Sequence, residues 1–168
     1  TSNALNKVFC SLDSEVMKLK SENPNESYSS ILIYYLLSRS GAAGFPTDKE
    51  FIDALTNRDV YHMFKKSREY LFDRLENGDT VERVNVIDMM ENGDLTIEHI
   101  MPQTLTEEWK AELGPDYQNV YDQNLHTLKN LTLTGYNSKY SNSLYSEKKN
   151  CEKGFKDSGL NLNKPLLD

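Results

Sequence analysis

Two short segments carry the residue types that could hydrolyse a phosphodiester bond. In the first, residues 96–103, Glu98 and His99 stand side by side in a β-branched run that Pro102 ends. A histidine with a reference pKa of about 6.5 is neutral often enough at pH 7 to take a proton from water as a general base. A carboxylate beside it supplies the oxygen ligand that a hard divalent cation prefers. We therefore interpret this segment as half of a metal-dependent phosphodiesterase site.

The second segment, residues 129–139, could complete the site. Residues 131–134 alternate Leu and Thr, which predicts a strand, and Gly135 permits a tight exit into a polar helix that starts near Asn137. The amide oxygen of Asn137 could return to the same spot as the carboxylate and bind the cation. The competing interpretation of Asn137 is a helix N-cap, a role that asparagine favours.

Strand geometry makes the adjacent acid and imidazole ambiguous. Neighbouring side chains on a strand point to opposite faces, so Glu98 and His99 could flank one phosphate only if the end of the strand is distorted near Pro102. The alternative for Glu98 is an ordinary salt bridge on its own face of the strand. The alternative for His99 is a structural histidine packed behind Pro102.

The first half of the chain has the pattern of a helical bundle. Apolar residues at helical spacing predict helices over about 5–19, 27–38, 47–55 and 58–76. The second of these is apolar on most faces, so we expect it at the centre. The turn signal at 92–94 suggests a division into a helical bundle region, 1–92, and a nuclease-like region, 93–168, which could pack together as one fragment of a larger protein. The expected fold class is mainly α with a small β-β-α finger.

Composition and charge limit the classes of function. The net charge of −7 disfavours a nucleic-acid binder, but residues 126–156 hold six lysines against two glutamates, a local +4. We predict that Lys139, Lys148 and Lys149 contact DNA phosphates; the alternative is a solvated helix face. The chain contains no run of about 18 apolar residues, so the sequence predicts no membrane span. Two cysteines without a CxxC pair argue against zinc and against a disulfide framework, so we expect a cytoplasmic protein.

Four ordered motifs together resemble a known family. They are Glu-His-Ile-Met-Pro-Gln at 98–103, Lys-Asn-Leu-Thr-Leu at 129–133, Asn-Ser-Lys at 137–139 and Ser-Glu-Lys-Lys at 146–149. Over about residues 93–165 they resemble the HNH-type (His-Me finger) nuclease domain at the C-terminus of GmrSD-type modification-dependent restriction endonucleases. The resemblance implies a β-β-α metal finger that cuts DNA with one divalent cation, usually Mg²⁺.

The same resemblance implies a role for each matching residue. His99 matches the general base and Glu98 the acidic metal ligand. Asn130 matches the middle asparagine, which braces the finger loop and which we group with His99 among the active-site residues. Asn137 matches the final metal-ligand position, where it stands in place of the usual histidine. The spacing from His99 to Asn137 is long for a minimal finger, so the predicted helix that carries Trp109 must be an insertion.

From these residues and the resemblance we predict a metal-dependent DNA endonuclease domain in a restriction system against modified foreign DNA. The resemblance also implies a nucleotide-hydrolysing ParB/sulfiredoxin-like domain or subunit as a partner, which has no counterpart in these 168 residues. The alternative is a degenerate finger that binds a partner or modified DNA without cutting it. RNA is a third possible substrate.

Overall fold

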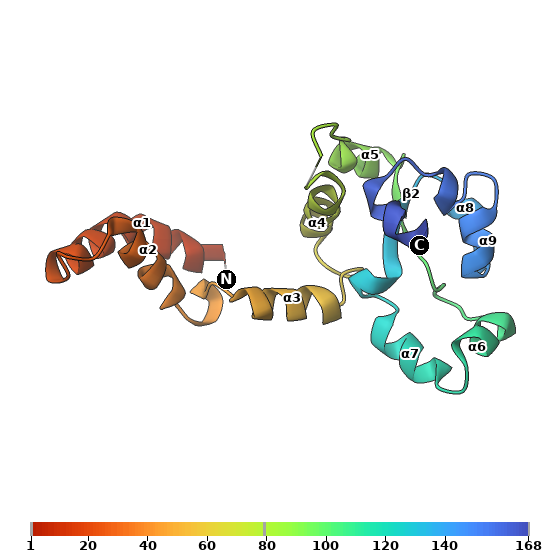
Figure 1. Ribbon diagram of the computed structural model, residues 1–168, viewed down its shortest axis with the longest axis horizontal. Helices are drawn as coiled ribbons and strands as arrows, with labels where there is room; N and C mark the ends of the chain where they lie inside the picture. The colour runs from red at the N-terminus through yellow and green to blue at the C-terminus, as the bar shows by residue number, and fades with distance from the viewer. Residues whose placement is uncertain (1, 79, 168) are drawn as a thin grey trace. The chain divides into compact units, whose positions relative to one another are not determined.

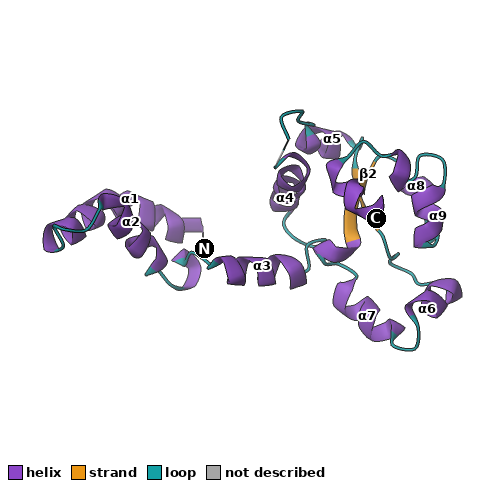
Figure 2. Cartoon of the chain, viewed as in Figure 1, coloured by secondary structure: helices purple, strands orange, loops and turns teal. Residues whose placement is uncertain are grey.

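The computed structural model describes residues 2–78 and 80–167. Over these residues it is mainly helical, and its one sheet has two strands (Figure 2). Contacts within the chain divide it into two compact units, and the boundary along the chain lies between Asp53 and Ala54. A helix both long and apolar enough for a membrane crossing does not occur among the described residues.

The first unit is a helical hairpin. Its elements are α1 (Ser2–Glu22), α2 (Tyr28–Leu37), the short 3-10 turn η1 (Gly41–Ala43) and the start of α3 (Asp48–Asn57), which crosses into the second unit. Helices α1 and α2 lie side by side (Figure 1), with Val8 and Val16 packed on Ile31 and Tyr35.

The prediction that the second helix is central is wrong. Only one side of α2 is buried in the described structure, and Ile33, Tyr34 and Leu37 on its other sides are exposed. A two-helix hairpin can cover only one stripe of a helix, so an apolar composition on most faces does not by itself bury the helix.

The second unit surrounds the sheet with short helices. Its elements after α3 are α4 (Lys65–Asn77), α5 (Val86–Asn92), β1 (Thr96–His99), α6 (Glu107–Leu113), α7 (Tyr117–Asn124), η2 (Leu128–Asn130), β2 (Leu131–Thr134), α8 (Asn137–Tyr140), α9 (Tyr145–Asn150), η3 (Phe155–Asp157) and η4 (Asn161–Leu167). The strands are antiparallel, and in their register Glu98 faces Thr132 while His99 faces Leu131. Both predicted strands are thus confirmed.

Strand β2 lies inside the unit, with all four of its residues buried. Leu131 and Leu133 join the core formed with Val60, Phe72 and Val86. On its other face, the hydroxyl of Thr132 donates to the side-chain oxygen of Asn163 in η4. Burial on both faces fixes the position of β2, and through the register it fixes β1.

Helix α4 belongs with the sheet. Its Phe72 is fully buried in the core, and the Glu76 carboxylate accepts hydrogen bonds from the backbone N–H groups of Asn161 (2.8 Å) and Leu162 (2.9 Å). The compact units divide between 53 and 54, so α4 and α5 lie in the same unit as the strands, whose apolar surface they cover. The division into a helical region, 1–92, and a nuclease-like region, 93–168, stays a prediction.

Two segments differ from their predicted structure. The helix expected from residue 58 begins at Lys65, because residues 59–64 form a turn in which the Val60 N–H donates to the His126 carbonyl (2.8 Å). The stretch up to about residue 125 is rich in Tyr, Asn and Gln, a composition that predicts a loop, but the structure forms α7 there. The side chains of α7 bond at helical spacing, as in Gln118 to Asp122 (2.9 Å) and Gln123 to Asn119 (2.8 Å). Such local pairs support a helix that has no clear apolar stripe.

Candidate active site

A polar pocket of about 230 Å³ lies beside β1. Its lining residues are Tyr61, Ile97, Glu98, His99, Pro102, Gln103, Asn137, Ser141 and Asn142. Three predicted site residues, Glu98 and His99 from β1 and Asn137 from α8, therefore meet at one pocket although they come from two separate segments. The other four predicted residues, Asn130, Lys139, Lys148 and Lys149, do not line it.

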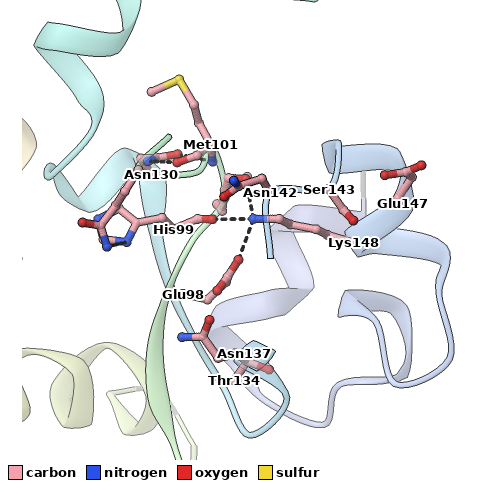
Figure 3. Close-up of polar contacts among 12 residues, drawn as sticks. Glu98, His99, Met101, Asn130, Thr134, Asn137, Asn142, Ser143, Glu147 and Lys148 are labelled. Carbon is pink, nitrogen blue, oxygen red and sulfur yellow. Dashed lines mark hydrogen bonds and ion pairs between the residues drawn. The ribbon is translucent and has the colours of Figure 1, made fainter. Parts of the chain in front are cut away.

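Glu98 points away from His99, toward α9, where it pairs with a buried lysine (Figure 3). The ammonium of Lys148 donates to Glu98 Oε1 (2.6 Å), to the His99 carbonyl (2.7 Å) and to the Ile100 carbonyl (3.1 Å). Burial raises the pKa of Glu98 above its usual value, although the hydrogen bond and charge of Lys148 oppose this. The salt bridge considered as the alternative for Glu98 is thus present.

The prediction that Lys148 contacts DNA is wrong. Its side chain is 0% exposed, and its three ammonium hydrogens have three oxygen acceptors within the protein. Lys148 instead joins α9 to the end of β1 and fixes the orientation of the Glu98 carboxylate.

The second oxygen of that carboxylate, Oε2, accepts no hydrogen bond from the described residues, although Glu98 lines the pocket. Asn137 leaves an oxygen available in the same way. Its Nδ2 donates to the Ile97 carbonyl (2.9 Å) and to the Thr96 hydroxyl (3.2 Å), so Oδ1 is the side of the amide left for a ligand. The N-cap of α8 is Tyr136, so the interpretation of Asn137 as an N-cap is wrong.

These two oxygens fit a hard cation. Among the residues that the structure describes, no three or more His, Cys, Asp or Glu side chains form a group that could hold a metal ion. Structural zinc sites need four such ligands and catalytic zinc sites three, whereas Mg²⁺ keeps several waters and binds one or two protein oxygens together with substrate phosphates. The donor set of one carboxylate and one amide oxygen therefore suits Mg²⁺ and does not suit zinc.

The His99 side chain points away from Lys148 (Figure 3) and lies among aromatic rings. Its ring meets Tyr61 edge-on (centroids 4.5 Å apart), Nε2 lies 3.2 Å from His126 Nδ1, and Nδ1 lies 3.4 Å from Gln103 Nε2. Burial, followed by the nearby charges of His126 and Lys148, lowers the pKa of His99 to about 4. The imidazole is therefore neutral at pH 7, the form that can accept a proton.

Asn130 braces the loop between the two strands. Its Oδ1 accepts from the Met101 N–H (2.6 Å), while Nδ2 donates to the carbonyls of Met101 (2.9 Å) and Leu125 (3.0 Å), as Figure 3 shows for Met101. Every polar atom of this side chain is thus used in holding the backbone that follows His99. Asn130 positions the site and touches no reacting group.

Helix α6 also supports the pocket. The indole of Trp109 is buried, and its Nε1 donates to the carbonyls of Asn142 (3.2 Å) and Ser143 (3.1 Å). Residue 142 lines the pocket, so the helix expected as an insertion between the motifs holds one of its walls.

The site also draws on residues before α4, which the sequence did not single out. Tyr61 lines the pocket, and His62, whose Nδ1 lies 2.8 Å from Asp59 Oδ2, contacts the ring of His126 (centroids 4.5 Å apart). The chain's three histidines, His62, His99 and His126, thus form one group. The only sequence signal was the acid three residues before His62, which is also common in surface turns.

The remaining two lysines lie at the surface. Lys139 is exposed, and Lys149 is half-buried, with its ammonium donating to the Leu167 carbonyl (2.6 Å). Neither position excludes or requires contact with DNA, so their role stays a prediction.

Residues 45–168 match the family of GmrSD restriction endonucleases, C-terminal domain. The chain belongs to this family. The match starts well before residue 93, and it includes the segment of Tyr61 and His62 that reaches the pocket. The same comparisons gave no match to a curated protein or to a solved structure. The GmrSD family places the chain among restriction-type nucleases, which act on DNA.

Proposed function

We propose that residues 54–168 form an HNH-type, Mg²⁺-dependent endonuclease that cuts modified foreign DNA. The observation that carries the proposal is the meeting of His99, Glu98 and Asn137 at one pocket beside an antiparallel strand pair that is followed by a helix. The order of elements, β1, β2 and α8, is that of a β-β-α finger with α6 and α7 inserted between the strands.

In this proposal each side chain has a defined task. His99, neutral at pH 7, takes the proton of the attacking water. Glu98 Oε2 and Asn137 Oδ1 would hold the cation, while Lys148 keeps the carboxylate in place. When bound, Mg²⁺ would neutralise charge on the scissile phosphate. Asn130 fixes the backbone after His99, so that the imidazole stays directed into the site.

Further parts of the proposal concern partners and location. Lys139 and Lys149 would contact the DNA backbone, because they are the predicted lysines that solvent reaches. Family membership supports a nucleotide-hydrolysing ParB/sulfiredoxin-like domain or subunit as partner, and a cytoplasmic location suits a restriction enzyme.

The decisive experiment is His99→Ala in a plasmid-cleavage assay with Mg²⁺. We expect cleavage to fall by a factor of about 10²–10⁴, the usual contribution of a general base, while the variant stays folded. His62→Ala is the matched control, because His62 is exposed and does not line the pocket. Cleavage by His99→Ala at the parent rate would refute the assignment.

A second candidate is a degenerate finger that binds DNA or a partner without cutting. The observation that favours it is the Lys148 ammonium, which already neutralises the carboxylate at Glu98. Titration with Mg²⁺ or Mn²⁺ separates the two candidates. A nuclease should show a saturable increase in cleavage and in melting temperature, whereas a degenerate finger should show neither.

A further inference from the structure

A second histidine stands directly behind His99. His126 Nδ1 lies 3.2 Å from His99 Nε2, so one of these nitrogens must carry the shared proton and the other must accept it. On the opposite side of the His99 ring, the side-chain nitrogen of Gln103 lies 3.4 Å from Nδ1. An amide nitrogen can only donate, so Nδ1 is the accepting atom. The proton of the neutral ring is then on Nε2, directed at His126.

His126 is held firmly enough to fix this arrangement. Its backbone carbonyl accepts from the N–H groups of Val60 (2.8 Å) and Tyr61 (3.3 Å). The Tyr61 ring stacks on the His126 ring with centroids 5.4 Å apart and planes 16° apart, and it also meets the ring of His99. The turn before α4 therefore sets both the position and the plane of the accepting imidazole.

The charge state of His126 agrees with the geometry. Burial, followed by the charge of His62, lowers the pKa of His126 below its ordinary value, and Asp59 opposes this only in part. His126 is accordingly neutral at pH 7, and a neutral imidazole has one nitrogen free to accept.

We propose that His126 is a positioning residue that accepts the Nε2 proton of His99 and so presents the unprotonated Nδ1 of His99 to the attacking water. This rests on the proposed nuclease function. Gln103 is exposed and its contact with Nδ1 is long, so a water can replace it there. The proton of that water moves to Nδ1, leaving hydroxide to form the new P–O bond as the leaving oxygen departs.

The test follows the tautomer of His99 directly, by ¹⁵N NMR of the imidazole in the whole chain. His126→Asn keeps an acceptor near the place of Nδ1, whereas His126→Leu removes it. His62→Asn is the matched control, because the His62 ring touches the His126 ring but makes neither a ring contact nor a hydrogen bond with His99 in the described structure. We expect the proton on Nε2 in the parent, in His126→Asn and in His62→Asn. In His126→Leu we expect loss of this preference and a fall in kcat of about 10- to 100-fold at unchanged KM.

Three results would overturn the inference: a parent His99 that is protonated on Nδ1, a His126→Leu variant that keeps both tautomer and kcat, or equal loss in the Asn and Leu variants with an unmoved tautomer. The last result would mean that His126 serves packing alone. The NMR measurement needs no cleavage, so it decides this inference even if the parent protein fails to cut DNA. Failure of the parent to cut DNA would refute the proposed function and not this inference.

Discussion

The two faces of strand β1 give their side chains opposite electrostatic surroundings. On one face Glu98 meets the buried ammonium of Lys148, a full opposite charge at 2.6 Å. On the other face His99 meets the rings of Tyr61 and His126, and burial, followed by the charge of His126, lowers its pKa so that it stays uncharged. Both side chains are almost fully buried, at 4% and 6% exposure, so the difference comes from their neighbours and not from their depth.

The comparison shows how strand alternation can serve one site. Adjacent residues on a strand are forced into different surroundings, so a carboxylate can be paired with an ammonium one residue away from an imidazole kept neutral. A metal ligand and a general base can thus be neighbours in the chain and still have different surroundings. The pocket at the end of β1 is where the two surroundings meet.

The largest effect should come from breaking the charged face. Lys148→Met would leave Glu98 buried without a partner, and we expect the free energy of unfolding to fall by about 3–5 kcal/mol. Urea denaturation measures this loss. Lys149→Met is the control, and we expect it to lower the free energy of unfolding by less than about 1 kcal/mol. Lys149 is half-buried and makes no ion pair in the described structure. The double variant Glu98→Gln/Lys148→Met should recover part of the loss. If it is as unstable as the single variant, an unpaired charge is not the cause.

The uncharged face should respond to pH. Burial and nearby charges lower the pKa of His99 to about 4, below the value of about 6.5 in the unfolded chain. The unfolded state therefore binds more protons in this window, and the contribution of His99 to stability is complete above pH ~6.5 and is lost as the pH falls toward ~4. The loss should not exceed about 3.4 kcal/mol.

The raised pKa of Glu98 has the opposite effect, because it makes the folded state more stable as the pH falls. The informative quantity is therefore how much more unfolding free energy the parent loses on acidification than His99→Gln does. Urea midpoints at neutral and mildly acidic pH should show a weaker acid loss in the variant. Equal losses in both proteins would mean that His99 is not held neutral by the fold.

Asn130 supports both faces of β1, because the Met101 backbone that it holds lies two residues after His99 and three after Glu98. Asn130→Ala removes three hydrogen bonds to Met101 and Leu125, and we expect a loss of about 1–3 kcal/mol in unfolding free energy. Asn130→Asp keeps the accepting oxygen but loses both donated bonds. It should therefore be no better than Ala, and a stable Asp variant with normal cleavage would contradict the bracing role.

The smallest effect should come from outside both faces. Lys139→Ala should leave stability unchanged and reduce the slope of log affinity for duplex DNA against log salt by about 0.9, the value for one phosphate contact. Lys7→Ala on α1 is the control, because this lysine is equally exposed but lies in the first unit. An unchanged slope for Lys139→Ala would assign that lysine to a solvated helix face.

Local patterns were enough to predict the elements around the site. The β-branched run ended by Pro102 and the alternation before Gly135 predicted both strands, and Asn137 does begin a helix. Glu98, His99 and Asn137 also meet as predicted. In each case the signal lies within a few consecutive residues, where backbone preference and side-chain alternation act directly.

Contacts between distant residues decided the rest. The sequence contains Lys148 in a basic, polar run that is typical of a surface, and only the packing of α9 against β1 turns it inward to Glu98, fifty residues away. The same holds for Tyr61 and His126, which reach His99 from a turn and a loop. The sequence by itself therefore determined the chemistry available near residue 98. The tertiary structure decided which partner each group has, because burial and pairing depend on long-range contacts that no local pattern encodes.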